Sequence, residues 1–114
     1  MIYIVSNQTT LYDDFEGIGY SNVEFCIQYF KNKKYIGCDT ETEGFSPYLK
    51  NLLLVQLGDE ENQFVIDNTV DITLFKDLFE DKSKVFIFHN AKFDLRFFLH
   101  KRIIIKNVYD TYLA

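Results

Sequence analysis

The sequence predicts an α/β domain built on a mixed β-sheet. Apolar, β-prone runs alternate with segments of helical periodicity along the 114 residues. Hydrophobic residues make up 47% and aromatic residues 18% of the chain, which is enough for a buried core and argues against disorder. A chain of this length has room for one small domain. We therefore expect one domain over residues 1–114, with helices flanking the sheet.

The first forty residues predict two strands around one helix. Residues 2–5 alternate as a short first strand. Ser21 is followed three residues later by Glu24, which resembles the capping box that starts a helix. Apolar residues at helical spacing then predict an amphipathic helix over 22–31, and the apolar run 35–40 predicts a buried strand.

The middle of the chain predicts a hairpin followed by a helix and an interior strand. Residues 52–58 and 63–67 are β-prone and are joined by a short acidic turn, as in a hairpin. Residues 71–79 place their apolar side chains on one helical side. The run 84–88 is too apolar for an edge strand, so we expect it inside the sheet.

The last part of the chain predicts a helix, a strand and the start of another helix. Residues 91–101 form the helix, with Asn90 as its N-cap. Residues 103–108 begin with three isoleucines and predict a final strand. Asp110 and Thr111 then begin a further helix. This order of elements implies a mixed sheet.

Composition narrows the classes of function. The net charge of −5 disfavours a protein that coats DNA electrostatically, but it allows a nuclease whose acids gather at a metal site. Cys26 and Cys38 are not spaced as a metal site, so we expect buried, reduced thiols and a cytoplasmic location. No apolar run approaches the roughly 20 residues of a membrane span, so we expect no membrane partner.

Two acids lie at the end of the predicted strand 35–40, at a spacing of two residues. Asp39 and Glu41 would project from the same face of a strand end. Carboxylates this close repel one another unless a cation lies between them, and hard divalent ions prefer oxygen ligands. Ligands of open α/β sheets bind at the carboxyl ends of strands. The alternative is an exposed acidic turn without a chemical role.

A second polar cluster, residues 89–94, follows the predicted strand 84–88. Asp94 lies in the first turn of the next helix, where the helix dipole favours an ionised acid. His89 could be a metal ligand or a base, or a polar wall that contacts substrate. Phe93 could face a ligand, and Asp94 alone could be a helix-start acid. With Asp39 and Glu41, this cluster indicates a metal-dependent phosphoryl-transfer site.

The two clusters together resemble the first two motifs of the DEDD (DnaQ-like) 3′→5′ exonucleases. The likeness is strongest to the proofreading domain of family A DNA polymerases, with ribonuclease D a near relative. It covers essentially the whole chain, with these segments in family order: YIGCDTETEG, LLLVQLG, FVID, VFIFHNAKFDLRFF and VYDTYLA. The resemblance implies an RNase H-like fold and hydrolysis of terminal phosphodiester bonds at the 3′ end of single-stranded DNA, with two Mg²⁺ or Mn²⁺ ions.

The resemblance also assigns roles to individual residues. Asp39 would bridge both metal ions, Glu41 would ligate the ion on the side of the nucleophile, and Asp94 would support the second ion. Phe45 matches the apolar residue that contacts the terminal base. The residues that match those lining the single-strand path are Thr42, His89, Asn90, Lys92 and Phe93.

One departure from the family concerns its third motif, a Tyr or His four residues before a fourth acid on a later helix. The 114 residues do not contain it. We therefore expect a truncated exonuclease domain of impaired activity, completed by a polymerase domain or a second chain. Apolar surface around Phe97, Phe98 and Leu113 would be uncovered and favour self-association. The alternatives are a degenerate domain that acts as a scaffold or nucleic-acid contact, and a ribonuclease D-like RNA exonuclease.

Overall fold

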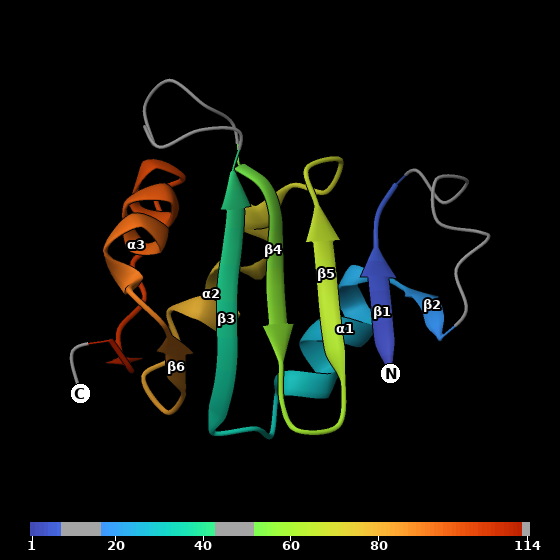
Figure 1. The fold of residues 1–114 in the computed structure, drawn as a ribbon, viewed down its shortest axis with the longest axis horizontal. Helices are drawn as coiled ribbons and strands as arrows, with labels where there is room; N and C mark the ends of the chain where they lie inside the picture. The colour runs from blue at the N-terminus through green and yellow to red at the C-terminus, as the bar shows by residue number, and fades with distance from the viewer. Residues whose placement is uncertain (8–16, 43–51, 113–114) are drawn as a thin grey trace.

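A computed structural model describes residues 1–7, 17–42 and 52–112 and confirms the α/β fold with a mixed sheet (Figure 1). The described strands form one seven-stranded sheet in the order β2-β1-β5-β4-β3-β6-β7. The strands are β1 (Ile2–Val5), β2 (Ile18–Ser21), β3 (Tyr35–Thr42), β4 (Leu52–Gly58), β5 (Gln63–Asp67), β6 (Val85–Phe88) and β7 (Val108–Asp110). The helices are α1 (Val23–Phe30), η2 (Ile72–Phe75), α2 (Lys76–Phe79) and α3 (Ala91–His100).

The middle of the sheet is antiparallel and its two sides are parallel. Strand β4 pairs antiparallel with both β3 and β5, and the β4–β5 hairpin has the predicted bounds. Strand β3 pairs parallel with β6 on its other side, so the predicted interior position of β6 is confirmed by its second neighbour, β7. Because β3 and β6 run in the same direction, their carboxyl ends lie at the same edge of the sheet (Figure 1).

Side chains of β3 alternate between the core and the open face of the sheet. Ile36 and Cys38 are buried in the core, whereas Asp39 and Glu41 are exposed. This is the two-residue period of a strand, and it places both acids on the face opposite the core. Cys26 and Cys38 are free, buried thiols, as predicted.

One hydrophobic core lies between the sheet and the described helices. In Figure 1, α1 and α2 lie behind the sheet. Helix α3 joins the same core through Phe98, whose ring centroid is 4.6 Å from that of Phe79 and 6.5 Å from that of Phe88. Phe97 and Phe98 are 4% and 1% exposed, so the prediction that they are uncovered is wrong. Leu113 lies outside the described residues.

The start of α1 differs from the predicted capping box. Ser21 is the last residue of β2, a strand that the sequence pattern did not predict, and it does not cap the helix. Asn22 is the N-cap, and its side-chain oxygen accepts a hydrogen bond from the backbone N–H of Phe25 at 2.8 Å. Asn is as good an N-cap as Ser, and the extended pairing of β2 with β1 leaves Ser21 one residue too early.

The segment predicted as a helix over residues 71–79 is two short turns of different type. A 3₁₀ turn, η2, is followed by one α-helical turn, α2. The side chain of Asp71 accepts hydrogen bonds from both the backbone N–H and the hydroxyl of Thr73. Such local bonds favour a tight start, and short helical pieces often close with i→i+3 bonds.

The predicted strand 103–108 is wrong, since only Val108 belongs to β7. Ile103 instead follows the end of α3. Arg102 is left-handed, with φ 63°, its N–H donates to the carbonyl of Leu99, and the N–H of Ile103 donates to the carbonyl of Phe98. These two bonds form a Schellman motif, in which an apolar residue beyond the left-handed one packs back on the helix. The burial of Ile103 comes from this helix end.

No helix in the described part of the chain is both long enough and apolar enough to cross a membrane.

Candidate active site

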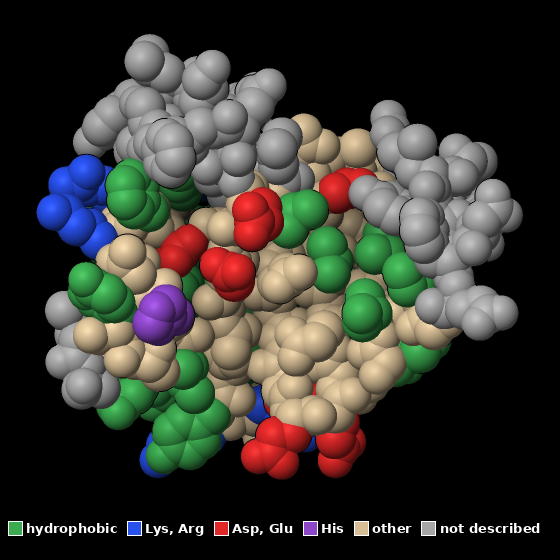
Figure 2. Space-filling model, viewed as in Figure 1, with side chains coloured by type: hydrophobic (Ala, Val, Ile, Leu, Met, Phe, Trp, Pro, Cys, Tyr) green, Lys and Arg blue, Asp and Glu red, His purple; other side chains and the backbone are tan. Residues whose placement is uncertain are grey.

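The predicted acids lie at the carboxyl end of β3, on the open face of the sheet. Asp39 and Glu41 are exposed there, opposite Gln56 and Leu54 of β4. Figure 2 shows acidic side chains gathered on this face near a histidine. Of the other residues predicted nearby, the side chain of Thr42 and the whole of Phe45 lie outside the described part of the chain.

Asp94 reaches the same end of β3 from helix α3. It lies in the first turn of the helix, as predicted, and is only 6% exposed. The hydroxyl of Thr40 donates a hydrogen bond to Oδ1 of Asp94. Thr40 stands between the two exposed acids, so the strand alternation turns it away from their face and toward α3. The sequence analysis missed Thr40, although its position between two same-face acids is the signal that would have found it.

The surroundings of Asp94 disfavour its ionised form. Burial raises its pKa, and although the hydrogen bond from Thr40 lowers it, the charges of Asp39 and Asp110 raise it further, to about 6. Burial, together with the charges of Asp94 and Asp39, raises the pKa of the Cys38 thiol well above its usual value, so Cys38 is an inert, protonated thiol.

The structure brings the three predicted metal ligands to one region but does not form a compact cluster. Within residues 1–7, 17–42 and 52–112, no three His, Cys, Asp or Glu side chains are grouped closely enough to hold a metal ion. Asp94 is nevertheless near enough to Asp39 for their charges to interact. The convergence of Asp39, Glu41 and Asp94 on metal ions therefore stays a prediction.

His89 borders a hollow beside Asp39. Its Nδ1 lies 2.9 Å from the hydroxyl of Thr111, which itself donates to the carbonyl of Phe88. The Thr111 hydroxyl therefore links the His89 ring to the end of β6. The hollow has a volume of about 430 Å³, and its lining includes Asp39, Gln56, Ile87, His89 and Thr111.

The start of α3 is capped by a distant acid and not by Asn90. Asn90 occupies the N-cap position, as predicted, but it is left-handed, with φ 62°, and its side chain makes no capping hydrogen bond. The carboxylate of Asp110 accepts from the N–H groups of Asn90 and Ala91, both at 2.8 Å, and from that of Tyr112 at 2.9 Å. These bonds lower the pKa of Asp110, with the bond from Ala91 the largest cause. No local sequence signal joins residues twenty positions apart.

The remaining predicted contact residues lie on the outer surface of α3. Lys92 and Phe93 are both exposed, and the ring of Phe93 is 43% exposed. They follow directly after the capped start of the helix and flank Asp94 in sequence. The structure therefore leaves both side chains accessible to a ligand at the carboxyl end of the sheet.

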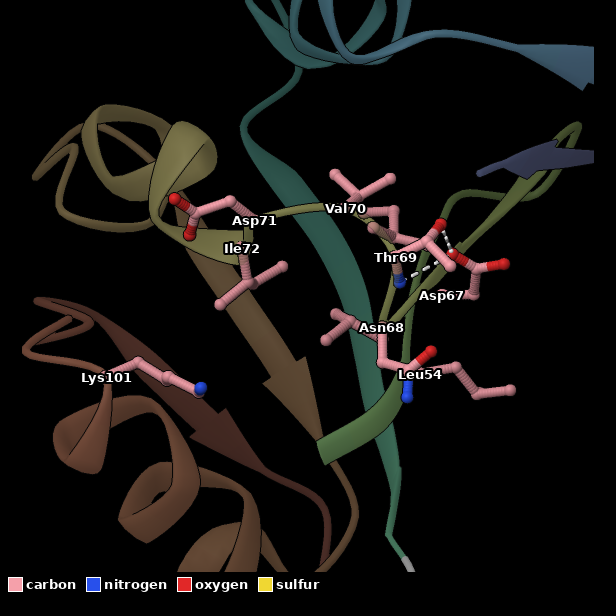
Figure 3. Close-up of a pocket in the computed structure, with 10 residues that line it drawn as sticks. Leu54, Asp67, Asn68, Thr69, Val70, Asp71, Ile72 and Lys101 are labelled. Carbon is pink, nitrogen blue, oxygen red and sulfur yellow. Dashed lines mark hydrogen bonds between the residues drawn. The ribbon is translucent and has the colours of Figure 1, made fainter. Parts of the chain in front are cut away.

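A separate pocket near the end of β5 does not share this chemistry. Figure 3 shows it between the residues that follow β5, the start of η2 and Lys101 beyond α3. Its two acids are already engaged in local turns, since Asp67 accepts from Thr69 and Asp71 accepts from Thr73. Acids satisfied in this way are structural parts of turns, and the lining of the pocket includes neither Asp39 nor Asp94.

Comparison with known proteins identifies the family. Residues 20–114 match the 3′–5′ exonuclease family. The chain belongs to this family. DNA polymerase I of Aquifex aeolicus is 35% identical to it over 104 residues, which are 89% of this chain and 17% of the polymerase. The resemblance to exonuclease domains that the two motifs indicated is confirmed.

Solved structures place this exonuclease-family chain in the RNase H-like fold. Escherichia coli RNase D, an exoribonuclease involved in structured RNA processing, matches with a TM-score of 0.67 and 27% identity, over 76% of this chain and 24% of RNase D. Brucella melitensis NrnC bound to pGG matches with a TM-score of 0.66 and 26% identity, over 72% and 43%. NrnC with bound Mg²⁺ has a TM-score of 0.63 and 20% identity, over 96% and 48%. The chain spans about a sixth of the polymerase and a quarter of RNase D.

Proposed function

We propose that this exonuclease-family chain removes nucleotides from the 3′ end of single-stranded DNA with two divalent ions. The observation that carries the proposal is the set of uncompensated acids at one end of the sheet. Asp39 and Glu41 share an exposed face. The charge of Asp39 acts on the buried Asp94, and among the described residues only Thr40 donates a hydrogen bond to the carboxyl group of Asp94. Acids so close together lower the stability of the fold unless a cation binds between them.

The donors at this site fit Mg²⁺ or Mn²⁺. Carboxylate oxygens are the ligands that these hard ions prefer, and the surroundings that raise the pKa of Asp94 are those that a nearby cation would offset. Asp39, Glu41 and Asp94 are the residues that would hold the ions. When bound, a pair of divalent ions stabilises the attacking and leaving oxygens of an in-line displacement at phosphorus. Mg²⁺ in the related NrnC supports the same choice of metal.

Other side chains would bind and orient the strand. Lys92 offers a cation for a phosphate, and the exposed ring of Phe93 offers a face on which a base can stack. The hydrogen bond between Nδ1 of His89 and the hydroxyl of Thr111 orients the ring and leaves Nε2 for a contact with the strand. The side chain of Asn90 makes no capping hydrogen bond, because Asp110 accepts from the N–H groups at the start of α3. This side chain can therefore contact the strand. Thr42 and Phe45 keep their predicted substrate-binding roles as proposals.

DNA is favoured over RNA by the sequence identity to a DNA polymerase. The chain shares 35% identity with a DNA polymerase I, against 27% with RNase D over a shorter part of the chain. By analogy with that polymerase, the proposed partner is a polymerase domain or a second chain. RNA is the second candidate substrate, because the fold matches RNase D and NrnC, the latter solved with pGG.

Gel analysis of labelled strands tests the activity. A 5′-labelled thymidylate strand with Mn²⁺ should shorten from its 3′ end, and a uridylate strand of the same length distinguishes DNA from RNA. Asp39→Ala should slow shortening by roughly a hundredfold or more. Asp77→Ala, an exposed acid of α2, is the matched control and should retain full activity.

Calorimetric titration with Mn²⁺ tests the metal site independently of cleavage. Asp39→Ala should bind Mn²⁺ more weakly than the wild-type chain, while Asp77→Ala should bind equally well. Equal binding by the wild type and Asp39→Ala would overturn the metal assignment. Strand binding without shortening, in the presence of Mn²⁺, would instead support a non-catalytic nucleic-acid contact.

A further inference from the structure

A groove along the outer edge of the sheet lies between β7 and α3, next to the proposed active site. Its volume is about 670 Å³, within the roughly 300–1,000 Å³ of pockets that hold small ligands. It is mostly apolar, and residues from both elements line it: Asn90, Ala91, Lys92, Leu95, Val108, Tyr109, Asp110 and Tyr112. The lining of this groove includes neither the proposed metal-binding acids nor the residues that line the hollow beside His89.

Two exposed tyrosines give the groove broad aromatic surfaces. Tyr109 of β7 is 51% exposed and Tyr112 is 64% exposed. Large exposed rings are costly to leave in water and are typical of binding surfaces. Among the described residues, the core is built from other side chains and does not include Tyr109. The two rings therefore fit the role of a stacking platform.

Charge in the groove favours a polyanion. Its charged lining residues are Lys92 and Asp110. The carboxylate oxygens of Asp110 accept from three backbone N–H groups, so Lys92 is the charged lining residue that is available to a ligand. Lys92 has Arg96 four residues further along α3, and both are exposed on that helix. Figure 2 shows basic side chains on the side of the molecule where Figure 1 places α3.

Tyr112 connects the groove to the proposed active site. Its ring lies edge-on to that of His89, with centroids 5.7 Å apart and planes at 84°. His89 in turn borders the hollow that contains Asp39. A strand whose 3′ end lies at the acids can thus continue past His89 and Tyr112 into the groove.

We propose that Tyr109 and Tyr112 form a stacking platform for nucleotides of a single strand upstream of the 3′ end. Their rings would stack on bases, and Lys92 with Arg96 would contact the phosphates between them. Stacking on aromatic rings tolerates any base, so the platform would lengthen the bound strand without adding sequence preference. This inference rests on the proposed function, because it assumes that the 3′ end lies at Asp39.

Fluorescence anisotropy with labelled thymidylate tests the platform by strand length. A dinucleotide reaches only the acids, whereas an octamer also reaches the groove. The affinity of the chain for each strand is measured in the presence of Ca²⁺. Tyr109→Ala/Tyr112→Ala should weaken octamer binding by about fivefold or more and leave dinucleotide binding unchanged. Tyr35→Ala removes a tyrosine of similar exposure, 58%, from the other end of β3 and should change neither. A uridylate octamer shows whether RNA uses the same groove.

Two further variants keep the test informative if the double alanine variant unfolds. Tyr109→Phe/Tyr112→Phe retains the rings and should bind the octamer like the wild type, which separates stacking from hydrogen bonding by the hydroxyls. Lys92→Gln should weaken octamer binding and lower the slope of log affinity against log salt concentration by about one.

Different experimental results would overturn the stacking platform and the proposed exonuclease function. Unchanged octamer affinity in Tyr109→Ala/Tyr112→Ala, or an equal loss for dinucleotide and octamer, would overturn the platform while Asp39-dependent shortening still supported the function. A wild-type chain that neither binds the octamer nor shortens it would overturn both.

Discussion

Two carboxylates of this fold, Asp59 and Asp94, lie at opposite ends of the sheet and have opposite pKa shifts. Asp59 follows β4 in the hairpin turn, and its pKa is lowered to about 2. Asp94 lies at the carboxyl end of β3, and its pKa is raised to about 6. Burial raises the pKa of both groups, so the difference comes from the partners that each one meets.

Asp59 has partners on every side. Tyr29 donates its hydroxyl at 2.7 Å, the N–H groups of Glu61 and Asn62 donate at 2.9 Å, and the Nζ of Lys33 lies 3.3 Å away. These donors outweigh the effect of burial. Asp59 therefore ties α1 to the hairpin and stabilises the fold in its ionised form.

Asp94 has one side-chain donor, Thr40, and two acids as neighbours. Asp39 and Asp110 both raise its pKa, and no salt bridge to Asp94 is found among the described residues. Its ionised form costs the fold stability. The contrast teaches that this protein surrounds Asp59 with hydrogen-bond donors and leaves Asp94, at the proposed active site, with one side-chain donor among the described residues.

The largest expected effect comes from a substitution of Lys84, whose ammonium group has a full set of hydrogen-bond acceptors. This buried side chain donates to the carbonyls of Phe30, Lys31 and Lys33 at 2.6–2.8 Å and so caps the end of α1. Lys84→Met leaves these carbonyls without their donor and should lower the free energy of unfolding by about 2–4 kcal/mol. Urea denaturation measures this, with the exposed Lys82→Met as the control that should change it by less than about 0.5 kcal/mol. A loss as small as that of the control would show that Lys84 is not structural.

The next effect sharpens the contrast at Asp94. A carboxyl group whose folded pKa is raised binds its proton more tightly in the native state, so stability falls as pH rises from about 4 to about 6. Asp94→Asn removes that loss and should raise the free energy of unfolding at pH 7 by roughly 1–3 kcal/mol in EDTA, and by almost nothing at pH 4. Thermal melting at both pH values measures this. A lower melting temperature at pH 7 would mark Asp94 as structural and contradict the comparison.

The smallest effect has the opposite sign and concerns Asp59. Its lowered pKa means that its stabilisation is complete above its usual value of 3.8 and is lost as pH falls toward about 2. Asp59→Asn should therefore lower the free energy of unfolding at pH 7 by about 1–2 kcal/mol, with the difference shrinking near pH 2. Denaturation across this pH range measures it, and Glu60→Gln, an exposed neighbour in the same turn, is the control. A difference that does not shrink in acid would assign the effect to packing.

The sequence by itself determined the features that follow from the residue periodicity of a single strand or helix. The bounds of β4 and β5, the shared face of Asp39 and Glu41, and the place of Asp94 in the first turn of α3 all follow from strand and helix geometry. The two motifs, taken in order, were also enough to indicate the exonuclease family that the comparisons confirm.

Only the tertiary structure decided which distant groups meet. The bond from Thr40 to Asp94 joins residues 54 positions apart, and the bond from Asn90 to Asp110 joins residues 20 positions apart. Local pattern also misplaced Ile103, because an apolar residue after a helix fits both a strand and a Schellman contact. Hydrogen bonds and charge interactions depend on distance in space, whereas periodicity reports only which face of its own element a side chain occupies.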